Sequence, residues 1–89
     1  MITGHALKRQ QQRGVPNLVL EWLERFGREQ HDHHGAMIYY FDKQARRQLE
    51  RYFGRTAVRR MHEFLNCYAI IDKSGSVLTV GHRYDRVRR

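Results

Sequence analysis

The sequence predicts an α+β domain in which helices cover an antiparallel sheet, with elements in the approximate order ααβααββ. Capping residues and apolar residues at helical spacing mark four helical segments, and short runs rich in aromatic and β-branched residues mark three strands. A length of 89 residues fits one core, because two halves would each be too small to bury one. We expect a single domain over residues 1–85 and a basic tail over residues 86–89.

Two helices open the predicted domain, and turn-forming residues mark their ends. Thr3 can cap a helix over His5–Arg13, and Gly14 stops it because glycine enters the left-handed conformation cheaply. Pro16 suits the first turn of a second helix, where its missing N–H costs little. Apolar residues at spacings of three, one and three give this helix one buried face, formed by Val19, Trp22, Leu23 and Phe26.

A strand and a second helical pair follow in the middle of the chain. The apolar run over residues 36–41 predicts a strand covered on both faces, and Arg28–His33 is a candidate edge strand beside it. Asp42 caps a helix that continues to Phe53. Its predicted inner face consists of Ala45, Leu49, Tyr52 and Phe53.

The last predicted elements are a fourth helix and a hairpin. Thr56 can cap a helix to about Asn66, with Ala57, Met61, Phe64 and Leu65 facing inward. Tyr68–Asp72 and Val77–His82 are separated by a four-residue loop and predict a β-hairpin. On the last strand, we expect Leu78 and Val80 to face the core.

The charge of the chain is strongly positive and unevenly placed. There are 17 Lys and Arg against 9 Asp and Glu, which gives a net charge of +8. Residues 1–42 carry five bases and five acids, so the whole excess lies in residues 43–89. Arginine predominates over lysine, and its planar guanidinium binds phosphate bidentately and stacks on bases. This asymmetry favours a polyanionic partner, against the alternative of an ordinary Arg-rich composition.

The segment between Lys43 and Arg60 is the main candidate binding surface, because seven basic residues there accompany one acid, Glu50. The predicted contact residues are Arg47, Arg51, Arg55, Arg59 and Arg60. Like charges one turn apart weaken an isolated helix, so an external counter-charge is expected, although solvated outer helix faces would look similar. With about five phosphates neutralised, log K should fall against log salt with a slope of roughly −4.

The end of the last strand offers candidate catalytic residues. Because strand side chains alternate, His82 and Tyr84 are expected on one face and Arg83 on the other. Histidine can transfer protons near neutral pH, arginine can stabilise charge on a phosphorane, and tyrosine can stack on a base. Together they suit metal-independent RNA cleavage through the 2′-hydroxyl. The alternative is a structural histidine at a strand end.

Other chemistry has weaker support. His31-Asp32-His33-His34 could hold a metal, but a polar turn before Gly35 explains it better, and we predict no metal site or cofactor. The lone Cys67 lies in an apolar string and is expected to be structural rather than nucleophilic. The phosphate-loop, Rossmann, serine-hydrolase and zinc-protease signatures do not occur in the sequence.

The N-terminal residues carry a family resemblance. His5-Ala6, Arg9 and Arg13-Gly14-Val15 follow the pattern His-Ala-x-x-Arg-x-x-x-Arg-Gly-(Ile/Val). This opening resembles that of small uncharacterised domains grouped with the RelE/ParE-like toxin superfamily. The resemblance implies helices before a curved antiparallel sheet, and a messenger-RNA endonuclease held silent by an antitoxin. The second helical pair, Lys43–Asn66, departs from the strand-to-strand connection of such toxins.

The same N-terminal residues have a physical interpretation. His5, Arg9 and Arg13 are spaced by four, so they lie along one stripe of the first helix. This stripe either faces RNA, with His5 as a further catalytic candidate, or forms the solvated back of the helix. The two interpretations have equal support from the sequence.

The sequence therefore predicts a small cytoplasmic protein that binds RNA or DNA and acts as a toxin-like ribonuclease. No apolar run approaches the roughly 18–20 residues that span a bilayer, so no membrane partner is expected. The alternative is a non-enzymatic interaction protein of phage or mobile-element type, which docks an acidic, antitoxin-like protein through its Arg-rich face. A homodimer through the aromatic strand Met37–Phe41 is a third interpretation.

Overall fold

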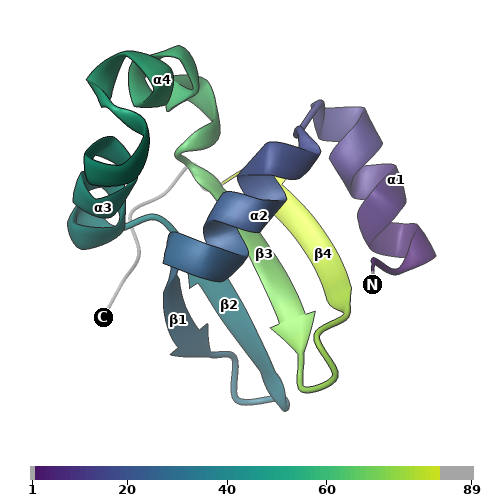
Figure 1. Cartoon of the computed structure of the whole chain (residues 1–89). Coiled ribbons are helices and arrows are strands. Elements are labelled where there is room, and N and C mark those ends of the chain that lie inside the picture. Colours follow the sequence, from purple (N-terminus) through teal and green to yellow (C-terminus); the bar gives the residue numbers. More distant parts are fainter. Residues whose placement is uncertain (1, 83–89) are drawn as a thin grey trace.

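Four strands form one antiparallel sheet in the order β1-β2-β3-β4, as the computed structural model shows for residues 2–82 (Figure 1). The strands are β1 (Arg28–His31), β2 (Ala36–Tyr40), β3 (Cys67–Asp72) and β4 (Val77–His82). The helices are α1 (Gly4–Arg13), α2 (Asn17–Phe26), α3 (Lys43–Phe53) and α4 (Arg55–Arg60), with a 3-10 turn, η1 (His62–Phe64). The predicted α+β class is confirmed, and β1 supplies the candidate edge strand.

The α1–α2 hairpin forms for the local reasons that the sequence indicates. The Thr3 side chain accepts a hydrogen bond from the Ala6 amide at 3.2 Å, and Gly14 ends α1 in the left-handed region at φ 62°. Buried Gln10 then fixes the turn, because its Nε2 donates to the Val15 carbonyl at 2.9 Å and to Asn17 Oδ1 at 2.6 Å. The two helices are thus held together by polar as well as apolar contacts.

The main core lies between α2 and one face of the sheet. Residues of β3 alternate between buried and half-buried, with Cys67, Ala69 and Ile71 on the covered face. Val80 of β4 pairs with Ala69 and is also buried. The most deeply buried large side chains are Leu23, Leu49, Val19, Val80 and Cys67. Such packing of a helix on an antiparallel sheet removes both apolar faces from water.

One detail of the predicted last strand is wrong. Leu78 is only half-buried, and Val77 shares the buried face with Val80. The pairing between β3 and β4 shifts at Ile70/Ile71, so that Leu78 is the extra residue of a bulge. An extra residue reverses the alternation on one side of it, and sequence periodicity alone does not reveal where this occurs.

The second helical pair is shorter and more exposed than predicted. Asp42 caps α3 as expected, but the predicted helix to Asn66 ends at Arg60, where tighter i to i+3 hydrogen bonds begin at Met61. Tyr52 and Phe53 were expected on the inner face, yet they are 72% and 44% exposed. Within α3, the buried residues end at Leu49, one turn before Phe53.

The helices lie at different places around the sheet (Figure 1). α2 crosses one face, α1 packs beside β4, and α3 with α4 stands on the other side of α2 from α1. Within the described part of the chain, no helix has the length and apolar character needed to cross a bilayer.

Candidate nucleic-acid interface

A basic hollow lies between α3, α4 and η1. It encloses about 260 Å³. The side chains that line it are Arg46, Glu50, Arg55, Val58, Arg59, His62 and Leu65. Three arginines and a histidine therefore converge on one depression, together with a single carboxylate.

Local structure positions these side chains. Arg55, Arg59 and His62 are spaced by four and three residues, so α4 and the turn after it present them on the same side. Nδ1 of His62 lies 3.1 Å from the Arg59 carbonyl oxygen and donates to it when protonated, which fixes the ring. From α3, Nη2 of Arg46 donates to the Leu65 carbonyl at 3.2 Å. That bond ties α3 to the segment that leads into β3.

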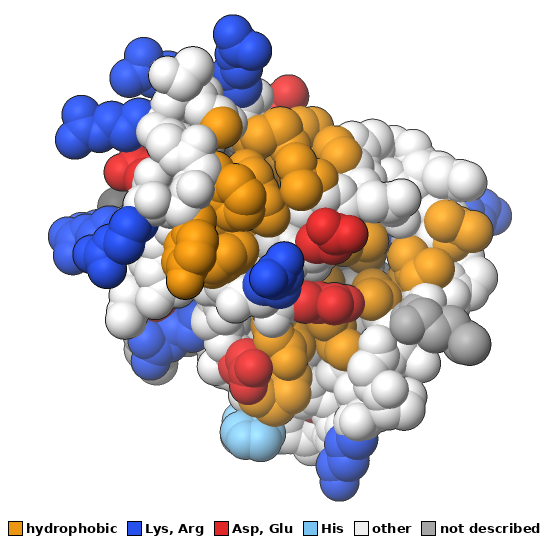
Figure 2. All heavy atoms as spheres, viewed as in Figure 1, with side chains coloured by type: hydrophobic (Ala, Val, Ile, Leu, Met, Phe, Trp, Pro, Cys, Tyr) orange, Lys and Arg blue, Asp and Glu red, His pale blue; other side chains and the backbone are white. Residues whose placement is uncertain are grey.

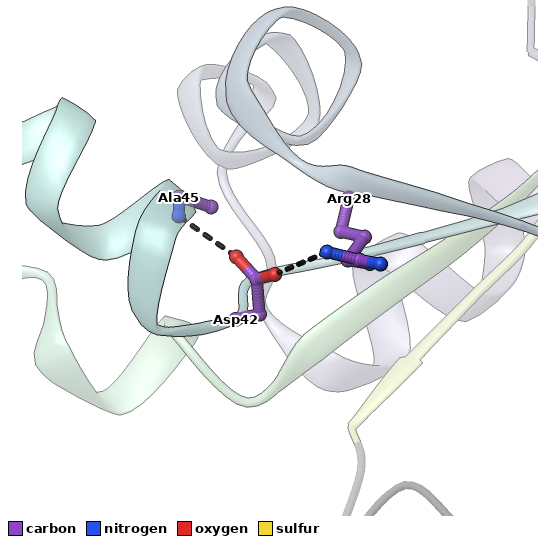
Figure 3. A network of polar contacts seen from close by, with 3 residues as sticks. All are labelled: Arg28, Asp42 and Ala45. Atoms are coloured by element: carbon purple, nitrogen blue, oxygen red, sulfur yellow. Dashed lines mark hydrogen bonds and ion pairs between the residues drawn. The ribbon is translucent and has the colours of Figure 1, made fainter. Parts of the chain in front are cut away.

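The arginines of α3 and α4 form no ion pair with a carboxylate among residues 2–82. The ion pair recorded there joins Arg28 Nη1 to Asp42 Oδ2 at 3.4 Å (Figure 3). The other carboxylate oxygen of Asp42 accepts the Ala45 amide at 2.8 Å, which caps α3. Asp42 is thus engaged at the start of α3, away from the hollow.

The remaining predicted contact residues of this region lie on its outer side. Arg47 and Arg51 are exposed and one turn apart on the side of α3 opposite its buried residues, and Arg60 is exposed at the end of α4. Figure 2 shows the basic side chains around α3 and α4 as a border along this side of the molecule. The hollow and this outer row together form what we call the α3–α4 basic surface: Arg46, Arg47, Arg51, Arg55, Arg59, Arg60 and His62.

The structure does not bring the α1 stripe to this surface. His5 and Arg13 are exposed and Arg9 is half-buried on α1, which lies on the other side of α2 (Figure 1). Both interpretations of this stripe, a surface that faces RNA and the solvated back of the helix, stay predictions.

The predicted catalytic histidine lies beside the buried cysteine. Nδ1 of His82 is 3.6 Å from Sγ of Cys67, its partner across the β3–β4 ladder. Burial raises the pKa of the Cys67 thiol to about 11, and the positive charge of Arg13 only partly opposes this. A thiol that stays protonated at neutral pH is a poor nucleophile, so a structural role fits Cys67. Arg83 and Tyr84 lie outside the described residues.

The histidine-rich segment forms a turn between β1 and β2. One carboxylate oxygen of Asp32 accepts the amides of His34 at 2.7 Å and Ala36 at 2.9 Å. These bonds hold the pKa of Asp32 below its usual value. Among residues 2–82, no three His, Cys, Asp or Glu side chains are grouped so that they could hold one metal ion.

Two residues of the hollow were not singled out from the sequence. Arg46 is one of the seven basic residues between Lys43 and Arg60 but not one of the predicted contact residues, and His62 lies just beyond that segment. A signal for His62 was present, because Arg55, Arg59 and His62 follow a 4–3 spacing along one helical stripe. For Arg46 the position depends on the contact with Leu65, which is distant in sequence.

Comparisons with protein-family models, curated proteins and solved structures gave no match for this chain. Function is therefore inferred from the geometry and charge of its own residues.

Proposed function

We propose that this chain is a cytoplasmic protein that binds RNA or DNA through the α3–α4 basic surface. The observation that carries the proposal is the convergence of Arg46, Arg55, Arg59 and His62 on one hollow, without carboxylate ion pairs to its arginines within residues 2–82. Unpaired guanidinium groups held close together repel one another. A bound polyanion removes that repulsion, so the arrangement favours such a ligand.

Phosphate fits the chemistry of the hollow. Guanidinium groups donate two parallel hydrogen bonds to phosphate oxygens, and a histidine N–H can add another. Arg46 already uses one N–H on the Leu65 carbonyl, which orients its guanidinium while leaving the remaining donors for a ligand. Arg47, Arg51 and Arg60 then contact neighbouring phosphates of the same backbone.

The number of arginines sets the expected salt dependence. Six arginines on the α3–α4 basic surface, each neutralising one phosphate of a single strand, give a slope of log K against log salt of roughly −4. Fluorescence anisotropy of labelled RNA and DNA oligonucleotides at several salt concentrations measures this slope. Undetectable or salt-independent binding would overturn the proposal.

An acidic protein partner is the competing interpretation of the same charge. A tagged chain captured from cell lysate separates the two, because nuclease treatment removes a nucleic-acid partner and leaves a protein partner bound. We expect the captured material to be lost on nuclease treatment. Charge reversal through Arg47→Glu and Arg51→Glu should reduce the capture as well.

The position of His82 favours RNA cleavage as an additional activity. His82 pairs with Cys67 at the end of the sheet where β3 begins, two residues after Leu65, which lines the hollow. In this proposal the 2′-hydroxyl attacks phosphorus to form a 2′,3′-cyclic phosphate while the P–O5′ bond breaks. His82 acts either as the general base that takes the 2′-hydroxyl proton or as the general acid that protonates the leaving O5′, and water exchanges the other proton. Arg83 would stabilise the phosphorane, and Tyr84 would position the base.

Incubation of labelled RNA with the pure protein, with ribosomes and without, tests cleavage. Added EDTA tests its independence from metal. We expect His82→Ala to abolish cleavage and His34→Ala, an exposed turn residue, to leave it intact. Inert wild-type protein under all these conditions would refute the ribonuclease and leave the binding proposal standing.

A further inference from the structure

Four aromatic side chains meet where the C-terminal ends of α2 and α3 come together. Trp22 stacks on Phe53 with ring centroids 5.2 Å apart, and Phe26 lies 5.2 Å from Tyr52 and 5.8 Å from Phe53. Trp22 is only 3% exposed, so the inner side of this aromatic cluster is anchored in the core. The outer side is open, because Tyr52 is 72% exposed.

The cluster is continuous with the α3–α4 basic surface. Arg51 directly precedes Tyr52, and Arg55 follows Phe53 after a single glycine. Figure 2 shows an apolar patch with basic side chains along its outer border, while acidic side chains lie on its α2 side. α3 and α4 carry seven bases and one acid, whereas α2 carries Glu21, Glu24 and Arg25. A polyanion is therefore drawn along the α3–α4 border of the cluster.

We propose that this aromatic cluster stacks the bases of single-stranded nucleic acid whose phosphates lie on the α3–α4 basic surface. Exposed aromatic rings beside a basic track are the usual means of binding a single strand, since every base offers a face for stacking. In a duplex the base faces cover one another and are closed to a protein ring. This inference rests on the proposed function and specifies the class of nucleic acid.

The cluster is suited to stacking because its rings are held in place before the ligand arrives. Phe53 is packed between Trp22 and Phe26, and Tyr52 rests against Phe26, so little side-chain freedom is lost on binding. Tyr52 offers the most open ring and is the residue expected to contact a base first. Phe53, 44% exposed, supplies the adjacent surface.

The test compares a short labelled oligouridine RNA with a duplex of equal length by fluorescence anisotropy. We expect tighter binding of the single strand. Tyr52→Ala should weaken it about fivefold to 150-fold, the range expected for loss of one stacked base, while the salt slope stays unchanged. Tyr52→Phe should retain the affinity. Leu18→Ala, which removes another exposed apolar side chain from α2 (44% exposed), is the control.

Trp22 is the sole tryptophan and provides a second readout, because it contacts Phe53 in the cluster. Its emission should change on titration with unlabelled oligouridine, and its unperturbed spectrum in free Tyr52→Ala should show that this variant folds. Two results would overturn this inference alone. One is salt-dependent binding that favours the duplex, and the other is salt-dependent binding of the single strand that Tyr52→Ala leaves unchanged. In either case the cluster would serve another partner. Absence of binding to every oligonucleotide overturns the proposed function together with it.

Discussion

Neutralising two arginines of the hollow should change the salt dependence of binding by a predictable amount. Arg55→Gln and Arg59→Gln remove two charges from side chains that line the hollow and have no carboxylate partner within residues 2–82. Each phosphate contact on a single strand contributes about 0.7 to the slope of log K against log salt. The slope should therefore change from about −4 to about −2.6.

This change is large enough to measure. With a slope of −4, affinity falls about 250-fold between 50 and 200 mM salt, and with a slope of −2.6 it falls about 40-fold. The matched control is Lys8→Gln with Lys73→Gln, which lowers the net charge equally at exposed positions on α1 and in the β3–β4 turn. Anisotropy titrations of the three proteins against the same oligouridine give the slopes directly.

The control decides how the result is interpreted. If binding depends on specific phosphate contacts in the hollow, the control pair keeps the wild-type slope. Equal slopes for the two double variants would show that only net charge matters. The convergence of Arg46, Arg55 and Arg59 would then have no role in binding.

Three further predictions concern the scaffold. Gly81→Ala should lower Tm by roughly 4–8 °C, because an added Cβ would lie 2.8 Å from Cε1 of Tyr68 and would push the end of this partly exposed side chain aside, at about 1 kcal/mol, the lower end of overpacking costs. Tyr68→Ala should suppress the effect, and an unchanged Tm would contradict it. Asp72→Ala should lower Tm at pH 7, because hydrogen bonds from the Ser74 hydroxyl and from the Ser76 and Ser74 amides hold the pKa of Asp72 below 3.8. A depressed pKa stabilises the fold above pH 3.8, so the Tm difference from wild type should narrow as pH falls below that value and should not persist in strong acid. The Cys67 thiol, with its pKa raised to about 11, should react with a thiol reagent only on unfolding; rapid labelling of the native protein would refute its burial.

Local signals explain why most elements could be predicted from the sequence. Thr3, Gly14 and Asp42 act through hydrogen bonds and backbone angles within a few residues, so the helix ends that they mark follow from the sequence itself. The strands follow from short apolar runs in the same way. Each of these features depends on neighbours along the chain and needs no knowledge of the tertiary structure.

The features that the sequence did not predict depend on long-range packing. The bulge at Leu78 reflects how β4 pairs with β3, and the exposure of Tyr52 reflects where the core ends against α3. An apolar residue at helical spacing is consistent with burial, but only the neighbouring elements determine whether something covers it. Tyr52 was therefore placed in the core by its spacing, although it protrudes.

The candidate site likewise has one part that can be predicted from the sequence and one part that depends on tertiary structure. The charge of α3 and α4 is evident from counting residues, whereas the hollow depends on the angle between two helices joined by Gly54 alone. Gly54 adopts φ 85°, a conformation that side chains rarely enter, and this redirects the chain so that Arg55 and Arg59 turn back towards Arg46. Sequence composition thus indicates the kind of ligand, and the turn determines where its phosphates are held.

The helical pair that carries the basic surface is weakly stabilised by its own contacts. α4 has six residues with Val58 as its buried side chain, and Arg55 and Arg59 place like charges one turn apart within it. Contacts with the core therefore fix α4 less firmly than they fix α2, which buries four side chains. A polyanion in the hollow relieves the repulsion and crosslinks α3 to α4 through their arginines. A ligand that binds only the native state stabilises it. The largest gain in stability from binding is therefore expected in α4, which the apolar core supports least.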